Sequence, residues 1–273
     1  MTQSPLTLDQ VARYAPSAFA REAHESRSSR YTYIPTVNII EGMMKAGFQP
    51  FKASQSRTRI EGKKEFTKHM IRFRQMNQSQ SLVVGDIIPE VVMINSHDGT
   101  SSYKLILGLY RLACLNGLMV SESEIGSISI HHKGNILEEV IEGSNHLISH
   151  AAESLDTVNK WQCLQLTTGE QQAFAEAARI LRFADSEGKV DTPITPELLL
   201  RPRRYADQGD DLWKTFNRVE ENVIKGGLSA IARDDNGRRL RRVSSRQVKG
   251  IDQDIKLNRA LWVLAERMAE LKR

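Results

Sequence analysis

Hydrophobic and polar positions alternate in blocks along the central stretch of the chain, residues 89–121. Three apolar runs, at residues 91–94, 103–114 and 118–120, are separated by polar clusters that contain Asp-Gly and Asn-Gly pairs. Because these pairs accept positive φ at low cost, the aliphatic and β-branched runs between them predict hairpin strands. A helix over residues 101–115, with serines at its start and Asn116-Gly117 at its end, is the alternative.

The residues before this stretch predict a helix followed by strands. Thr36 is suited to cap a helix that continues to Gly47. Alternating polar and apolar residues predict strands at 48–59 and 67–75, and shorter ones at 82–84 and 125–131. In the second strand, Arg72 and Arg74 lie on the face opposite Ile71 and Phe73, so we expect one basic face and one apolar face.

The second half of the chain has a mainly helical pattern. Apolar positions spaced three and four apart predict helices over residues 136–155, 169–183, 210–224 and 257–271. Residues 185–204 contain three prolines and predict an extended linker that is the best hinge candidate. Residues 228–249 predict a basic hairpin that turns at 235–237, and we expect the helices of Trp213 and Trp262 to pack together.

These elements predict an α+β fold. We expect an antiparallel β-meander with flanking helices, followed by a mostly helical second half with a basic β-hairpin. The change of pattern divides the chain into residues 1–132, the meander domain, and residues 133–273, the mainly helical region. We expect the two regions to pack as one unit.

Three stretches carry a resemblance to a known family. The runs NSHDGTSSYKLILGLYRLACLNGLMV at 95–120, LWKTFNRVEENVIKGG at 212–227 and RRVSSRQVKGIDQDIKLNRALW at 241–262 resemble the phage/plasmid-like family called domain of unknown function 932. The resemblance implies a mobile genetic element, such as a plasmid, a prophage or an integrative element, and implies no settled biochemistry. On the order of its elements alone, helix, strands, helix, the first half also resembles single-strand-annealing proteins of the Rad52 type.

Composition and charge narrow the classes of function. The chain has 273 residues, enough to bury a core without a metal or a disulfide, and a formal net charge of +5. A basic balance suits nucleic acid or another acidic partner. No signal peptide and no apolar run of about 18 residues is apparent, so we expect a cytoplasmic protein with no membrane contact.

Two basic clusters are the candidate nucleic-acid-binding sites. The first contains Lys52, Arg57, Arg59, Lys63, Lys64, Arg72 and Arg74, and the second contains Arg238, Arg239, Arg241, Arg242, Arg246 and Lys249. Arginine pairs its planar donors with phosphate oxygens, and a basic strand face can follow a single strand. The alternatives are a solvated basic loop for the second cluster and a lysine-protected edge hairpin for the first.

Catalytic groups are less evident. Asn95, His97 and Asp98 could form an acid–base or metal pair, although a turn explains the same residues. Glu221, Asp252 and Asp254 could hold magnesium in a nuclease or could pair with nearby arginines. The phosphate loop, the dinucleotide fingerprint and the serine elbow are all missing from the sequence, which argues against ATPases, dinucleotide enzymes and serine hydrolases.

The leading hypothesis is therefore a DNA-binding accessory protein that needs no cofactor. It would act on DNA, single-stranded in the first instance, in the recombination or replication of a mobile element. We expect a binding protein rather than an enzyme, and a homo-oligomer. A metal-dependent nuclease and a protein-binding module, such as an inhibitor of host defence, are the alternatives.

Overall fold

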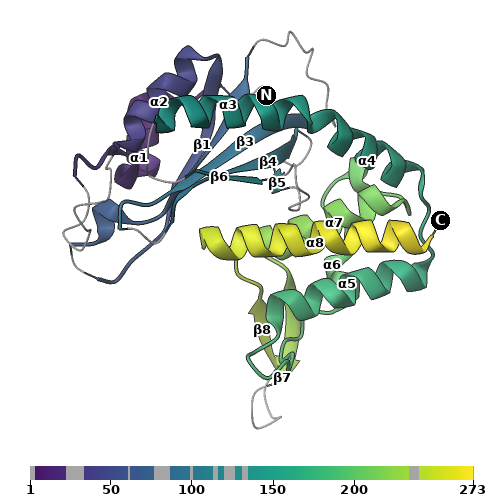
Figure 1. Cartoon of the computed structure of the whole chain (residues 1–273). Helices are drawn as coiled ribbons and strands as arrows, with labels where there is room; N and C mark the ends of the chain where they lie inside the picture. Colours follow the sequence, from purple (N-terminus) through teal and green to yellow (C-terminus); the bar gives the residue numbers. More distant parts are fainter. Residues whose placement is uncertain are drawn as a thin grey trace. The chain divides into compact units, whose positions relative to one another are not determined.

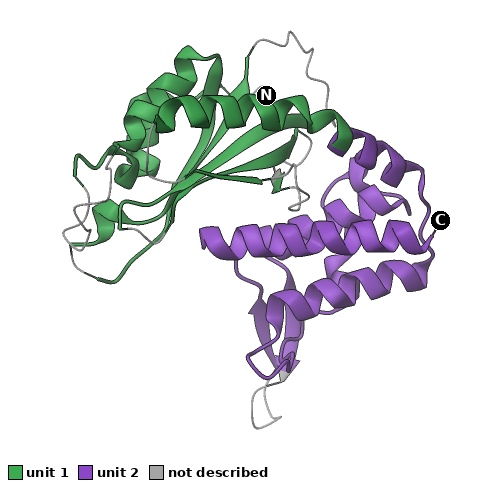
Figure 2. Cartoon of the chain, viewed as in Figure 1, with its two compact units in different colours: residues 1–153 green, residues 154–273 purple. Residues whose placement is uncertain are grey.

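The computed structural model describes residues 4–22, 34–60, 62–76, 87–98, 101–112, 116–119, 127–130, 135–233 and 240–272. The chain divides into two compact units, Met1–Glu153 and Ser154–Arg273 (Figure 2). The division falls later than the predicted boundary at residue 132, because helix α3 (Ile136–Ser149) packs on the strands of the first unit. The prolines of residues 185–204 lie inside the second unit and not at the division.

Unit 1 is an antiparallel sheet with helices on one face (Figure 1). Besides α3, its helical elements are α1 (Leu8–Tyr14), η1 (Pro16–Phe19), α2 (Thr36–Lys45) and η2 (Lys64–Phe66). Its strands are β1 (Phe48–Gln55), β2 (His69–Gln75), β3 (Ile87–Asn95), β4 (Tyr103–Arg111), β5 (Asn116–Met119) and β6 (Ser127–Ile130). Together with the helices of unit 2, this arrangement confirms the predicted α+β fold.

The sheet has the strand order β1-β2-β3-β4-β5, and β6 also pairs with β4. Strands β5 and β6 share one edge of β4, since β5 lies opposite Gly108–Arg111 and β6 opposite Tyr103–Ile106. The central apolar runs are thus strands, as predicted. The prediction of a turn at Asn116-Gly117 is wrong, because both residues belong to β5 and pair with β4. The short strand predicted at 82–84 lies outside the described residues.

The apolar face of the sheet packs against α2 and α3. Val91 and Met93 of β3 pair with Leu107 and Leu105 of β4, and all four are buried. A Cβ on Gly143 of α3 would lie 3.0 Å from the Leu105 side chain, so the helix approaches the sheet closely at this glycine. The hydrophobic core of unit 1 therefore lies between the sheet and these helices.

Unit 2 is a helical bundle that carries a two-stranded ribbon (Figure 1). Its elements are α4 (Ala151–Cys163, which begins in unit 1), α5 (Thr168–Phe183), α6 (Pro196–Leu199), η3 (Tyr205–Asp207), α7 (Leu212–Lys225), β7 (Ser229–Arg233), β8 (Leu240–Ser244) and α8 (Ile251–Leu271). Helices α5, α6 and α8 pack against α7, whose apolar and polar residues are nearly all buried.

Aromatic rings fill the centre of unit 2. Trp161 of α4 lies 4.7 Å from Trp262 and 5.7 Å from Phe216, measured between ring centroids. Phe216 also meets Trp262 edge-on at 5.9 Å, so the helices of Trp213 and Trp262 do pack together. Sequence reasoning did not assign Trp161 to this cluster.

The proline-rich segment is fixed to this bundle. Arg179 of α5 donates to the carbonyl of Ile194 at 2.7 Å, and both Ile194 and Leu199 are buried. Asn222 of α7 donates to the carbonyls of Leu199 and Arg201 at 2.8 and 2.9 Å. These contacts contradict the hinge predicted for this segment, because a hinge has few anchored groups.

Candidate nucleic-acid interface

The predicted basic hairpin forms an antiparallel ribbon of β7 and β8. Its register pairs Ser229 with Ser244, Ala230 with Val243, Ile231 with Arg242 and Ala232 with Arg241. Because directly paired residues share a face, Ile231 and Arg242 lie on one face of the ribbon and Arg241 on the other. Leu240, two residues before Arg242, lies on the face of Ile231. The tip, which contains the predicted site residues Arg238 and Arg239, lies outside the described residues.

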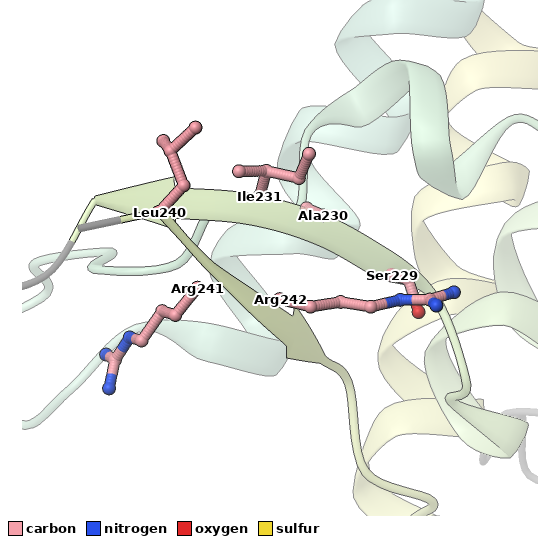
Figure 3. Close-up of a pocket in the computed structure, with 6 residues that line it drawn as sticks. All are labelled: Ser229, Ala230, Ile231, Leu240, Arg241 and Arg242. Atoms are coloured by element: carbon pink, nitrogen blue, oxygen red, sulfur yellow. The ribbon is translucent and has the colours of Figure 1, made fainter.

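Two large apolar side chains on this ribbon are exposed to solvent. Ile231 exposes 70% of its surface and Leu240 exposes 73%. Figure 3 shows both side chains projecting from the same side of the ribbon, while Arg241 points away from them. With Ser229, Ala230, Arg241 and Arg242, they line an open hollow of about 420 Å³. Since the two residues are diagonal neighbours across the strands, they form one apolar patch beside arginines.

The arginines of the ribbon are available to an anionic ligand. Arg241 and Arg242 are exposed, and neither side chain has an ion-pair partner within the part of the chain that the structure describes. Arg246 and Lys249, which follow β8, are exposed as well. An exposed guanidinium group without an ion-pair partner can bind two oxygens of one phosphate, and no internal ion pair has to break first.

The base of the ribbon is fixed to the end of α7. Backbone hydrogen bonds of 2.8 Å run from Gly227 N to Ser245 O, from Ser245 N to Leu228 O and from Val248 N to Ile224 O. Arg182 of α5 donates to the carbonyls of Val223 and Arg246 at 3.4 and 3.0 Å. The last carbonyls of a helix have no partner within it, so Arg182 and Val248 complete α7 while they hold the ribbon. Burial lowers the pKa of Arg182 from its usual value.

The exposed cations of the first basic cluster lie between β1 and β2 and on β1. Lys52, Arg57, Arg59 and Lys64 are exposed, and Lys63 is half-buried. Arg57 and Arg59 belong to the irregular segment after β1, and Lys64 begins η2. Gln55 holds this segment in place by donating to the carbonyl of Lys64 at 2.6 Å. This surface is a second candidate for phosphate contact, but it is a loop and not the strand face that the alternation predicted.

Arg72 and Arg74, in contrast, are not available for nucleic acid, which corrects the prediction for these two residues. They share one face of β2, as predicted, but this face is buried. The Nε atoms of both arginines lie 2.7 Å from Glu90 of β3, and the three side chains are at most 5% exposed. The Arg74 guanidinium lies over the rings of Phe51 and Tyr110, at 4.1 and 3.8 Å from their centroids. A buried pair of cations that share one carboxylate holds the sheet together and presents no surface to DNA.

A buried polar network, which sequence reasoning did not predict, lies where α2 meets the sheet. The Thr36 hydroxyl lies 2.9 Å from His69 Nε2, 3.1 Å from His97 Nε2, 3.1 Å from Asn95 Nδ2 and 3.3 Å from the Tyr103 hydroxyl. All five residues are fully buried. The prediction that Thr36 caps α2 is wrong. Pro35 is the N-cap residue, no side chain caps the helix, and Thr36 is its first residue.

The hydrogen-bond partners of His69 define its protonation. Its Nδ1 lies 3.0 Å from the Ser17 hydroxyl and 3.3 Å from the Thr67 carbonyl, which can only accept. Nδ1 therefore carries the proton, and Nε2 accepts from the Thr36 hydroxyl. Burial and the neighbouring His97 lower the pKa of His69 to about 3, against smaller opposing effects of Thr67 and Asp98. A neutral, enclosed histidine of this kind connects η1, α2 and β2.

The carboxylates considered for a metal site have other partners. Glu221 accepts a bidentate pair of hydrogen bonds from Arg204 at 2.6 and 2.7 Å and a third from Lys225 at 2.9 Å. Burial would raise the pKa of Glu221, but these hydrogen bonds outweigh it and the pKa is lowered. Asp254 accepts from Asn258 at 2.9 Å. Among the described residues, no group of three or more side chains is arranged to hold a metal ion.

Comparison with known proteins identifies the family. The family described as "Domain of unknown function (DUF932)" matches residues 23–262. The chain belongs to this family. The UPF0380 proteins YafZ and YfjQ of Escherichia coli (strain K12) are each 44% identical to it over 264 residues, which cover 97% of this chain and 92% of each relative. No solved structure matches the chain.

The family match confirms the resemblance noted in the sequence. The matched residues 23–262 include parts of both units. Among the described residues, no helix combines the length and the apolar character needed to cross a membrane.

Proposed function

We propose that this member of the family is a nucleic-acid-binding protein whose principal contact is the β7–β8 ribbon. The observation that supports the proposal is the pair of exposed arginines, Arg241 and Arg242, on a ribbon whose base is hydrogen-bonded to α7. Arg246 and Lys249 extend the same basic surface beyond β8. Phosphate contacts from such side chains position a protein on nucleic acid.

The sheet of unit 1 is not the principal nucleic-acid contact in this proposal. The expectation of single-strand binding rested on a basic face of β2, and the arginines of that face are paired with Glu90 in the interior. The loop cations Arg57, Arg59 and Lys64 remain a secondary contact. A role as an accessory protein of a plasmid, phage or integrative element, acting in the cytoplasm on DNA, is part of the same proposal and rests on the family resemblance.

A salt titration tests the proposal. Fluorescent single-stranded and double-stranded oligonucleotides are titrated with the protein at several salt concentrations, with and without magnesium. Each phosphate contact contributes about −0.9 to the slope of log affinity against log salt, so R241A/R242A is expected to reduce the slope by about 2. The control, K160A/R267A, removes two exposed cations from α4 and α8 and should leave the slope unchanged.

Three outcomes would contradict the proposal. A wild-type protein that binds no oligonucleotide at low salt would show that the basic ribbon is only a solvated surface. If R241A/R242A and K160A/R267A reduce the salt slope equally, the reduction reflects net charge and not contacts of the ribbon. Shortened oligonucleotides in the magnesium samples would favour the nuclease alternative, and the products are therefore checked on a gel.

A further inference from the structure

We propose that the β7–β8 ribbon enters a groove of double-stranded DNA and places Ile231 and Leu240 against the base pairs. This inference rests on the proposed function and deepens it, because it names the duplex as the ligand and assigns the apolar patch a role. Arg242, on the same face, and Arg241, on the opposite face, would reach phosphates on the two sides of the groove.

The dimensions of the ribbon suit a groove. Each of its strands has five residues, and at roughly 3.4 Å per residue such a strand is about 17 Å long. The minor groove, from which apolar wedges act, is roughly 6 Å wide and 7.5 Å deep, and β-ribbons can bind in either groove of DNA. The described part of the ribbon is therefore long enough to span the depth of a groove while its base stays attached to α7.

The apolar side chains distinguish a duplex from a single strand. Proteins that bind single strands stack the bases on aromatic rings, and residues 228–249 contain no aromatic residue. Branched aliphatic side chains such as isoleucine and leucine instead act as wedges between base steps of a duplex and bend it. Ile231 and Leu240 are of this type, and they are among the most exposed large apolar side chains of unit 2.

The attachment of the ribbon supports a wedge function. Inserting a side chain between base steps costs a few kcal/mol of stacking, so the inserting element has to keep its position. The 2.8 Å backbone bonds between Gly227, Leu228 and Ser245 join the two arms of the ribbon at its base, and the bond from Val248 to Ile224 ties the segment after β8 to the end of α7. Charge complementarity adds to this, because the arginines beside the patch attract the phosphates that flank any groove.

Duplex bending provides the test. The protein is titrated into a duplex of about 30 base pairs with a donor and an acceptor dye at its ends, and bending is measured as a rise in energy transfer. I231S/L240S is expected to lower duplex affinity by at least roughly tenfold and to abolish bending, with an unchanged salt slope. The control, I180S/L271S, replaces one exposed isoleucine and one exposed leucine on α5 and α8 and should behave as wild type. Circular dichroism confirms that each variant is folded.

The outcomes separate this inference from the proposed function. If no nucleic acid binds at all, both fail. If R241A/R242A reduces the salt slope while I231S/L240S binds and bends the duplex as wild type does, only the inference fails. It also fails if the protein prefers a single strand and I231S/L240S leaves that preference unchanged. Loss of a homo-oligomer in I231S/L240S with intact DNA binding would instead assign the patch to self-association.

Discussion

The backbone of Arg246 passes so close to Gly226 that a Cβ on residue 226 would lie 2.6 Å from the Arg246 carbonyl carbon. Gly226 has φ 62° and ψ −150°, a conformation that is essentially restricted to glycine. It ends α7, and its carbonyl accepts a hydrogen bond from Arg203. The absence of a side chain at this one position therefore lets the segment after β8 pack against the helix.

Replacing Gly226 should release the base of the ribbon. We expect G226A to lower the free energy of unfolding by about 3 kcal/mol or more, because backbone strain and the clash with Arg246 add together. Urea denaturation measures this change. G227A is the matched control, since Gly227 also has a positive φ, 78°, but a Cβ there meets nothing within 4 Å. It should cost about 1–2 kcal/mol, and equal losses in the two variants would contradict the close approach.

The buried arginines of β2 should contribute to the stability of the fold and not to the proposed DNA binding. Neutralising Glu90 in E90Q leaves Arg72 and Arg74 without their carboxylate, and we expect a loss of about 3–5 kcal/mol in the free energy of unfolding. E270Q is the control, because the Arg267–Glu270 pair is exposed and its loss should leave the free energy of unfolding nearly unchanged. The salt slope of DNA binding should be unchanged in folded E90Q protein, and a changed slope would return these arginines to the interface.

The buried histidine predicts a loss of stability in acid. His69 has a pKa of about 3 in the folded state and an ordinary value of 6.5, so only the unfolded chain binds its proton between these values. Above about pH 6.5, His69 does not affect the free energy of unfolding. As the pH falls from about 6.5 to about 3, the protonation of His69 in the unfolded chain lowers the free energy of unfolding by about 1.4 kcal/mol per pH unit. Below about pH 3 this loss no longer increases.

This pH dependence is measured by urea denaturation between pH 7 and pH 5. Relative to H69Q, which cannot titrate at this position, the wild type should lose about 2 kcal/mol over this range. H146Q, which changes an exposed histidine of α3, controls for the loss of a histidine in general. Parallel pH profiles for the wild type and H69Q would show that His69 is not held neutral.

The bidentate contact between Arg204 and Glu221 should show strong coupling. A double-mutant cycle with R204A and E221Q is expected to give a coupling free energy of about 2–3 kcal/mol, because Glu221 is buried. The same cycle on the exposed Arg267–Glu270 pair should give a much smaller coupling free energy. A coupling near zero at Arg204–Glu221 would contradict the bidentate contact and would leave Lys225 as the main partner of Glu221.

Local pattern was enough to predict the strands among the described residues, most helices and the paired arms of the hairpin. The apolar runs of β3 and β4 are bounded by turn residues, and a basic stretch around Asp-Asn-Gly has few alternatives to a hairpin. Where the local rule failed, a distant partner decided the outcome. Thr36 forgoes a cap because His69, His97 and Asn95 surround its hydroxyl, and these residues are distant in sequence.

The candidate site was only partly predictable for a related reason. Alternation placed Arg72 and Arg74 on one face of β2, but it does not reveal what covers a face or that Glu90 lies on the next strand. Ile231 and Leu240 pose the opposite problem, since apolar residues in a strand are normally assigned to the core. Only the register and exposure of the ribbon show that these two face solvent.

The strand edges of unit 1 bear on how the protein behaves at high concentration. Strand β4 is covered on its outer edge by two short strands, and β1, at the other end, contains Pro50 and a break in register beside it. Edges that are short or interrupted in this way hinder edge-to-edge pairing with strands of other molecules. We therefore expect the described edges of this sheet to disfavour β-sheet aggregation of an overproduced protein as long as its helices stay packed on the sheet.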